Sequence, residues 1–211
     1  MPHAQTSIVV GIAGGTASGK TTFAERLAGL LPRRSVQLLD HDAYYRDRSD
    51  LPPAERAKVN FDHPDALESD LLAAHIRDLR QGRAIEKPCY DFATHARRPQ
   101  TERVEPAEVL LVEGILVLAA EEIRRELDLR LFVDTPADLR ILRRVRRDVA
   151  ERGRTIDGVM AQYMTTTRPM HERYVEPSRA FADLVIPALE DNDRALRMAA
   201  DALRHRLRLV D

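Results

Sequence analysis

The segment SIVVGIAGGTASGKTTF, residues 7–23, carries the strongest structural signal in this chain. Its first residues form an apolar run typical of a buried strand, and its last residues open an amphipathic helical pattern. The glycine-rich turn at residues 14–21 satisfies the eight-residue pattern of a phosphate-binding loop. Glycine suits such a loop because the backbone must approach the phosphates closely and adopt positive φ angles. We therefore expect a strand, loop and helix that bind a nucleotide.

The loop supplies candidate nucleotide-binding residues with distinct roles. Lys20 is placed to reach the β and γ phosphates, and the Thr21 hydroxyl is placed to ligate magnesium. The N-terminus of the following helix adds a partial positive charge. A glycine-rich turn without a ligand is the alternative, but both the pattern and its strand–helix context are met. The candidate nucleotide-binding residues are Gly14, Gly15, Thr16, Ala17, Ser18, Gly19, Lys20, Thr21 and Thr22.

Composition limits the class of protein. The 211 residues, of which 44% are hydrophobic, suffice for one core, so we expect a single domain over residues 1–211. The 33 basic and 34 acidic residues nearly balance, which gives no indication of nucleic acid or a membrane as partner. The single cysteine, Cys89, excludes an internal disulfide. The absence of a signal-like N-terminus and of a membrane-length apolar run indicates a soluble, cytoplasmic protein.

Strand and helix patterns alternate along the rest of the chain and predict an α/β fold with a mostly parallel sheet. Residues 88–97 are predicted to be a loop whose aromatic residues and histidine form either a platform for a flat ring or a small hydrophobic hairpin. The further strand patterns occupy residues 36–39, 109–112, 129–133 and 183–186, and helical patterns cover residues 67–79, the stretch after Pro136, residues 155–170 and the C-terminal segment through Leu207.

Acidic residues follow two of the predicted buried strands. Ligands of open parallel sheets bind at the carboxyl ends of the strands, so these residues should lie near the phosphate loop. Asp40 or Asp42 is a candidate to accept the proton of an attacking hydroxyl, with capping of a turn as the alternative. Glu113 is a candidate to support magnesium or its water shell, with capping of the next segment as the alternative.

A row of arginines marks the helix predicted after Pro136. Spacings of three and four place its members on one face. Such a row can form a mobile lid that neutralises charge on a transferring phosphoryl group and excludes water. A solvated basic face fits the pattern equally well, because the chain is rich in arginine. The arginines concerned are Arg140, Arg143, Arg144 and Arg147, followed by Arg152 and Arg154.

Taken together, the motifs resemble the uridine kinase (uridine-cytidine kinase) family of P-loop nucleoside kinases, from the first predicted strand to the final helix. The phosphate loop is generic, whereas the joint occurrence of NFDHPDA and YDFATHARR is specific. The matching segments are GIAGGTASGKTT (11–22), DAYYRD (42–47), NFDHPDA (60–66), YDFATHARR (90–98), VEGIL (112–116), FVDTPADLR (132–140), RRDVAERGR (146–154) and AQY (161–163).

The resemblance implies a P-loop NTPase fold, a three-layer α/β sandwich with a mostly parallel sheet. It also implies a small substrate-binding hairpin excursion and an arginine-rich lid at about residues 144–158, all within one kinase domain. In that family the γ-phosphoryl group of ATP or GTP moves, with Mg²⁺, to the 5′-hydroxyl of uridine or cytidine. The products are UMP or CMP, and the reaction belongs to pyrimidine salvage.

Roles for individual residues follow from the same resemblance. Asp42 matches the general base, and Lys20, Arg147 and Arg152 match residues that act on the phosphates. Thr21 and Glu113 are the expected metal-site residues. The positions expected to bind the nucleoside are Asp42, Tyr45, Asp62, Tyr90, Phe92, His95, Arg144, Arg154 and Gln162.

Two departures from the family pattern concern the base and the phosphate donor. His41 and Ala43 stand beside the expected base, where the family usually has glutamine and serine. Residues 187–189 read Pro-Ala-Leu where the family has Pro-Arg-Gly, and Asp191 is the expected donor-binding residue in that loop. The choice between ATP and GTP therefore stays open.

Two rival functions also stay open at this point. One is a phosphoribulokinase-like or other small-molecule kinase on the same scaffold, against which the aromatic residues at 88–97 suit a nucleobase. The other is a non-catalytic nucleotide-binding regulatory module. The expected partner is a small-molecule nucleoside, and a homo-oligomer, specifically a tetramer, is implied by the resemblance alone.

Overall fold

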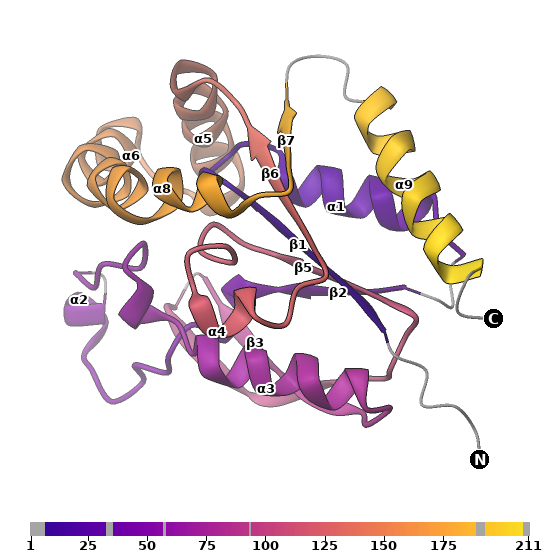
Figure 1. Cartoon of the computed structure of the whole chain (residues 1–211). Coiled ribbons are helices and arrows are strands. Elements are labelled where there is room, and N and C mark those ends of the chain that lie inside the picture. Colours follow the sequence, from indigo (N-terminus) through magenta and orange to yellow (C-terminus); the bar gives the residue numbers. More distant parts are fainter. Residues whose placement is uncertain (1–6, 33–35, 57, 93, 189–192, 209–211) are drawn as a thin grey trace.

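A five-stranded parallel sheet forms the centre of the molecule (Figure 1). Its strand order is β2 (Val36–Asp40), β5 (Val109–Glu113), β1 (Ile8–Gly14), β6 (Leu129–Asp134) and β7 (Leu184–Pro187). The predicted parallel α/β sheet is thus confirmed. This computed structural model describes residues 7–32, 36–56, 58–92, 94–188 and 193–208.

Alternate side chains of β1 pack against different helices, so the sheet has a hydrophobic core on each face. Val10 packs in a buried cluster with α1 (Lys20–Gly29) and α9 (Asp193–Arg208). Val9 belongs to a second cluster with α3 (Ser69–Arg80) on the opposite face. Figure 1 shows these helices on the two sides of the sheet, which confirms the predicted three-layer sandwich.

The other elements build the region beyond the strand ends. An antiparallel hairpin, β3 (Ile85–Asp91) and β4 (Ala96–Val104), replaces the loop predicted at residues 88–97. The long helix α5 (Ala137–Arg152) follows β6. The remaining elements are η1 (His41–Tyr44), α2 (Pro53–Arg56), η2 (Pro64–Ala66), α4 (Glu121–Arg124), α6 (Ile156–Gln162), η3 (Tyr163–Thr167), α7 (Arg168–Met170), η4 (His171–Val175), α8 (Glu176–Ser178) and η5 (Arg179–Phe181).

Two predicted helices have different limits in the structure. The helix predicted over residues 67–79 begins at Ser69, because Leu67 instead forms an isolated antiparallel bridge with Tyr45. The helix predicted over residues 155–170 continues to Ser178 and contains two π-helical turns, η3 and η4. Within the described part of the chain, no helix has both the length and the apolar character that crossing a membrane requires.

His41 fills the space beside the ends of β2 and β5. The side chain is fully buried, and its Nε2 lies 3.1 Å from Ser69 Oγ. Any side chain at Gly114, directly after β5, would collide with it. Burial lowers the pKa of His41 to about 4, although the charge of Asp42 acts in the opposite direction. The folded chain therefore holds a neutral imidazole next to the strand ends.

Replacing His41 with glutamine should reduce the acid sensitivity of the fold. A histidine of the unfolded chain binds a proton near pH 6.5, whereas folded His41 binds one only near pH 4. The folded state therefore loses stability as the pH falls between these values, by about 2 kcal/mol at pH 5. We expect urea denaturation at pH 7 and pH 5 to show a smaller loss for His41→Gln than for the wild type. His205→Gln, an exposed control on α9, should keep the wild-type profile, and an unchanged profile in His41→Gln would contradict the assignment.

Candidate active site

The phosphate loop connects β1 to α1 and is held from the side of β6. Gly19, at the N-cap of α1, has φ 89°, a conformation that favours glycine. The Ser18 N–H donates to the Gly15 carbonyl at 3.1 Å, and the Thr135 hydroxyl donates to the Ser18 carbonyl at 2.8 Å. Thr135 received no site role from the sequence, because its contact with the loop spans 117 residues. These hydrogen bonds tie the loop to itself and to the segment that follows β6.

Lys20, Thr21 and Glu113 meet at the start of α1. The Thr21 hydroxyl donates to Glu113 Oε1 at 2.9 Å, and Lys20 Nζ lies 3.9 Å from Glu113 Oε2. Burial raises the pKa of Glu113, and the nearby Lys20 charge opposes this shift. Register pairs Glu113 with Asp40 of β2, and burial raises the pKa of Asp40 as well. Two desolvated carboxylates therefore lie next to each other at the strand ends, and Glu113 contacts the phosphate loop.

This arrangement fits a magnesium ion that is shared with bound phosphates. Glu113 Oε2 is buried and has no hydrogen-bond partner among the described residues. The Thr21 hydroxyl, a hard oxygen ligand, lies next to the same carboxylate. Among the described residues, no cluster of three or more acidic, histidine or cysteine side chains is available to hold a metal. Mg²⁺ commonly takes only one or two carboxylates, with phosphates and water as its other ligands.

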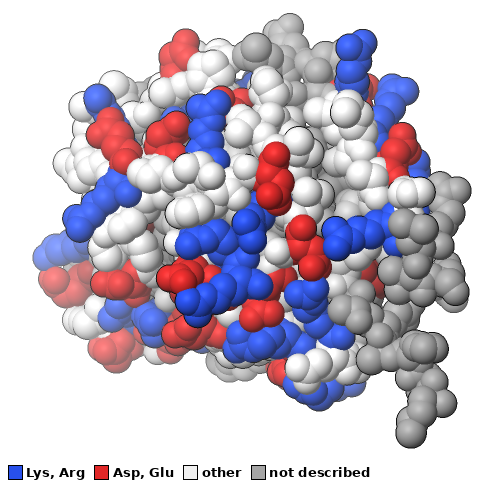
Figure 2. Space-filling view, in the orientation of Figure 1, with Lys and Arg blue, Asp and Glu red and all other residues white. Residues whose placement is uncertain are grey.

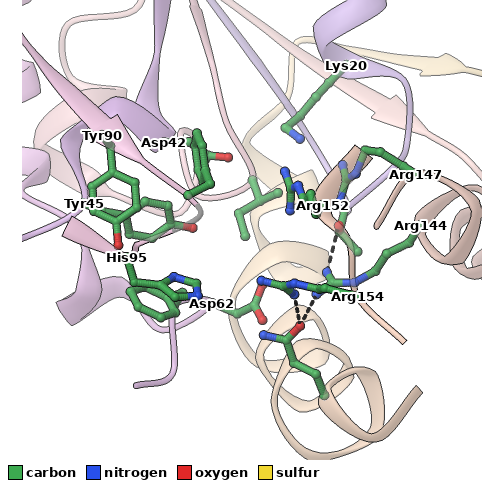
Figure 3. Close-up of a pocket in the computed structure, with 15 residues that line it drawn as sticks. Lys20, Asp42, Tyr45, Asp62, Tyr90, His95, Arg144, Arg147, Arg152 and Arg154 are labelled. Atoms are coloured by element: carbon green, nitrogen blue, oxygen red, sulfur yellow. Dashed lines mark hydrogen bonds between the residues drawn. The ribbon is translucent and has the colours of Figure 1, made fainter. Parts of the chain in front are cut away.

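A pocket lies beyond the phosphate loop and contains most of the residues that the sequence singled out (Figure 3). Its empty space, including the part that is open to solvent, is about 630 Å³. Asp191 lies outside the described residues. The lining residues are Thr16, Lys20, Asp42, Tyr45, Phe61, Asp62, Tyr90, Phe92, His95, Ile115, Arg144, Arg147, Arg152, Arg154 and Gln162.

Aromatic rings form one wall of the pocket. Tyr45 lies 5.1 Å from Tyr90 and 6.5 Å from Phe92, measured between ring centroids. Phe61 stacks on His95 at 4.7 Å with an interplanar angle of 14°. The hairpin alternative for residues 88–97 is therefore confirmed, and its rings line the pocket, where a platform for a flat ring stays a prediction. Phe61 received no role from the sequence, although it lies within the NFDHPDA segment.

Arginines form the opposite wall, as Figure 3 shows. We call Arg144, Arg147, Arg152 and Arg154 the arginine cluster. Arg144 donates to the Thr16 hydroxyl at 3.0 Å and to Gln162 Oε1 at 2.9 Å. Arg154 donates to the same Gln162 oxygen at 2.7 Å. The cluster is therefore tied to both the phosphate loop and α6.

Asp148 organises the arginine cluster and was missed by sequence analysis. Its carboxylate is fully buried and lies within 4 Å of a guanidinium nitrogen of every member of the cluster. Arg144 precedes Asp148 by four positions in α5, and Arg152, the last residue of α5, follows it by four. This i,i+4 spacing is a recognisable sequence signal. The predicted row was wrong in one member, because Arg143 is exposed to solvent on the outer side of α5.

Asp42 lies between the two walls in Figure 3. Its charge raises the pKa of both Tyr45, on the aromatic side, and Glu113, on the phosphate-loop side. A molecule with a flat ring on the aromatic wall would thus direct its remaining part towards Asp42 and Lys20. The geometry is suited to a group transfer between a phosphate bound by the loop and a small molecule in the pocket.

Asp148→Asn should destabilise the protein, because it keeps the size of the side chain but removes the charge that the arginine cluster shares. Removing one partner of a buried ion pair leaves uncompensated charge, which costs about 3 kcal/mol or more. We expect urea denaturation to show a fall of that size in the free energy of unfolding. Asp138→Asn, at the exposed first turn of the same helix, should cost no more than about 1 kcal/mol. Equal losses in the two variants would contradict the organising role of Asp148.

Comparison with known proteins places the chain in one family. The model of the phosphoribulokinase / uridine kinase family matches residues 9–195. The uridine kinase of Chloroflexus aurantiacus is 50% identical over 191 residues, which cover 90% of this chain and 91% of that protein. The uridine kinase of Clostridium botulinum strain Okra is 44% identical over 200 residues, 95% of this chain and 97% of that protein.

A solved structure shows the same fold at a larger evolutionary distance. Phosphoribulokinase from Rhodobacter spheroides superimposes with a TM-score of 0.64 at 16% identity, over 87% of this chain and 70% of that chain. Because the family model spans most of the sequence and the relatives match over nearly their whole length, this chain belongs to the phosphoribulokinase / uridine kinase family.

Proposed function

We propose that this protein is a uridine/cytidine kinase that transfers the γ-phosphoryl group of ATP or GTP to the nucleoside 5′-hydroxyl. The observation that carries this proposal is the composition of one pocket. It joins the phosphate-loop residue Lys20 to a wall of aromatic rings, with Asp42 between them. Relatives with 44–50% identity over most of the chain bear the name uridine kinase.

Phosphoryl transfer in this site uses groups on both sides of the bond that breaks. Lys20 binds the β and γ phosphates, while the N–H groups of the loop hold the remaining phosphate oxygens. Asp42 orients the 5′-hydroxyl and takes its proton as the oxygen forms a bond to the γ phosphorus, and the bond from that phosphorus to the departing diphosphate oxygen breaks. Thr21 and Glu113 would hold Mg²⁺, which neutralises negative charge on the phosphates.

The arginine cluster has two tasks in this proposal. Arg147 and Arg152 approach the phosphates as part of a lid at about residues 144–158 and offset the negative charge of the transferring group. Arg144 and Arg154 contact the nucleoside together with Gln162. Exclusion of water by the lid would also prevent hydrolysis of the donor nucleotide.

The nucleoside lies along the aromatic wall. Tyr90, Phe92 and His95 surround the pyrimidine, and Phe61 adds a ring that stacks on His95. Asp62 accepts hydrogen bonds from the ribose hydroxyls. A sugar-phosphate acceptor is the closest competing substrate, because arginines line the other wall, but it would leave this apolar, aromatic surface without a partner.

A coupled assay of nucleoside diphosphate release tests the proposal. The enzyme would be supplied with Mg²⁺ and ATP, then with GTP, and offered uridine, cytidine, adenosine, ribulose 5-phosphate or pantothenate. We expect turnover with uridine and cytidine alone. Turnover with a sugar phosphate alone would show that the acceptor is that sugar phosphate and not a nucleoside. No turnover with any acceptor would favour a regulatory module. Light scattering after size exclusion would test the tetramer that the family resemblance implies.

Asp42→Asn should abolish most of the turnover and leave nucleotide binding intact. Loss of a positioned general base typically lowers the rate by about 10²–10⁴-fold, because the amide cannot accept the proton of the hydroxyl. Steady-state kinetics would measure kcat, and calorimetry would measure ATP binding. Asp50→Asn, an exposed position eight residues further along, provides the control with normal kcat. Near-normal turnover by Asp42→Asn would reject Asp42 as the base.

A further inference from the structure

Thr167 makes a buried contact with Asp62 that the phosphoryl-transfer chemistry does not require. Its hydroxyl donates to Asp62 Oδ2 at 2.9 Å, across 105 residues of sequence. Only 3% of Thr167 is exposed, and the residue borders a small cavity next to the main pocket, together with Asp62. Asp62 also lines the main pocket itself. Thr167 therefore contacts Asp62 from the small cavity and does not itself line the main pocket.

We propose that Thr167 is a positioning residue for sugar recognition, which fixes the Asp62 carboxylate towards the ribose and thereby strengthens the preference for ribose over 2′-deoxyribose. The proposal rests on the proposed function, in which Asp62 accepts hydrogen bonds from the ribose. One carboxylate oxygen, Oδ2, is held by the protein. The Asp62 side chain is thus oriented before the nucleoside arrives, and less side-chain entropy is lost on binding.

The two neighbouring threonines show that this contact is specific to position 167. The hydroxyl of Thr165 donates to the carbonyl of Ala161 at 2.8 Å, and that of Thr166 donates to the carbonyl of Gln162 at 3.0 Å. Both are the local bonds that threonine commonly makes within a helix. The Thr167 hydroxyl reaches across to another segment instead. The Thr167 hydroxyl therefore connects the helical segment to Asp62, whereas the other two hydroxyls bond only within the segment.

The π-helical turn η3 explains how Thr167 reaches Asp62. A π-helical turn closes over five residues, one more than the bond of an α-helix. Gln162 precedes this turn and Thr167 ends it, so two residues five apart lie on the same side of the segment. Gln162 contacts the arginine cluster and Thr167 contacts Asp62. In a regular α-helix these two side chains would point in directions roughly 140° apart.

The charges around Asp62 make the hydroxyl donor important. Burial raises the pKa of Asp62, which favours the neutral acid. Arg144 and Arg154 lower this pKa, as does the Thr167 hydrogen bond, while the charge of Asp42 raises it. Tyr45 also faces Asp62. The hydroxyl therefore helps to keep an acceptor carboxylate charged in a desolvated site.

Thr167→Val tests the inference, because valine has nearly the shape of threonine and removes only the hydroxyl. We expect KM for uridine to rise about tenfold, equivalent to about 1.4 kcal/mol, with kcat changed less than about twofold. The KM or inhibition constant of 2′-deoxyuridine should change less. The acid limb of the kcat/KM profile should move to higher pH, since the pKa of Asp62 rises further. Thr167→Ser should restore wild-type values, and Thr165→Val is the matched control in the same π-helical turn.

Each other result overturns a defined part of the proposal. Unchanged KM and pH profile in Thr167→Val, with uridine turnover by the wild type, would overturn the role of Thr167 alone. Equal effects of Thr165→Val and Thr167→Val would identify general loosening of η3 and overturn it too. An unchanged KM in Asp62→Asn would overturn the role of Asp62, and therefore that of Thr167, while the kinase function stands. A wild type that does not phosphorylate uridine would overturn the proposed function and this inference together.

Discussion

Parallel register at the carboxyl ends of three strands is the constraint on which the site depends. Glu113 of β5 lies opposite Ile12 of β1 and opposite Asp40 of β2. The phosphate loop leaves β1 two residues after Ile12, and η1 leaves β2 directly after Asp40. A slip of one residue in either pairing would turn the side chains of that strand to the other face. The two hydrophobic cores, one on each face, oppose such a slip because it would expose their apolar side chains.

This register brings negative charges together in a dry environment, and positive charges from other segments compensate for them. Asp40, Asp62 and Glu113 all have pKa values raised chiefly by burial. Lys87 acts on Asp40 and Lys20 acts on Glu113, so two of the three lysines of the chain stabilise these carboxylates. Charges of both signs are also interspersed over the face of the molecule shown in Figure 2. On this face, no large area of the described residues carries charge of one sign alone.

The arginine cluster carries more charge than its protein partners neutralise. Four guanidinium groups lie within 4 Å of the buried Asp148 carboxylate, and the charges of Asp62 and Asp42 also act on members of the cluster, so four positive charges face three carboxylates. Burial lowers the pKa of Arg144 and of Arg152, which indicates that these cations are poorly solvated. A phosphate group in the pocket would supply the missing negative charge, at a position where the cations are already oriented. Folding has already desolvated and oriented these cations, so less free energy is needed for this when an anion binds.

Local patterns allowed most of the fold and much of the pocket to be predicted, whereas contacts between distant segments did not follow from them. The phosphate loop, the five strands and the carboxylates at their ends each have a signal within a few residues. Spacings of three and four fitted Arg143 as well as Arg144, and only packing of α5 decides which one is buried. Thr135 and Thr167 were missed because their partners lie in other elements. Asp148 was missed although its arginine partners lie on α5 or just after it, because the spacing alone does not show that the carboxylate is buried.

The irregular segment from α6 to α8 also makes contacts with distant segments that local sequence patterns did not predict. These contacts depend on its irregular helix geometry. Its side chains reach four separate parts of the site: Gln162 contacts the arginine cluster, Thr167 contacts Asp62, His171 accepts from Arg140 beside the phosphate loop, and Tyr174 contacts His63. Each residue of a regular α-helix turns by about 100°, so Thr167, His171 and Tyr174 would lie within about 60° of one another, whereas Gln162 would point away from them. The π-helical turn η3 lies between Gln162 and Thr167 and supplies the extra residue that brings these two side chains to the same side. The segment consequently contacts the arginine cluster, Asp62 and Arg140 at the same time.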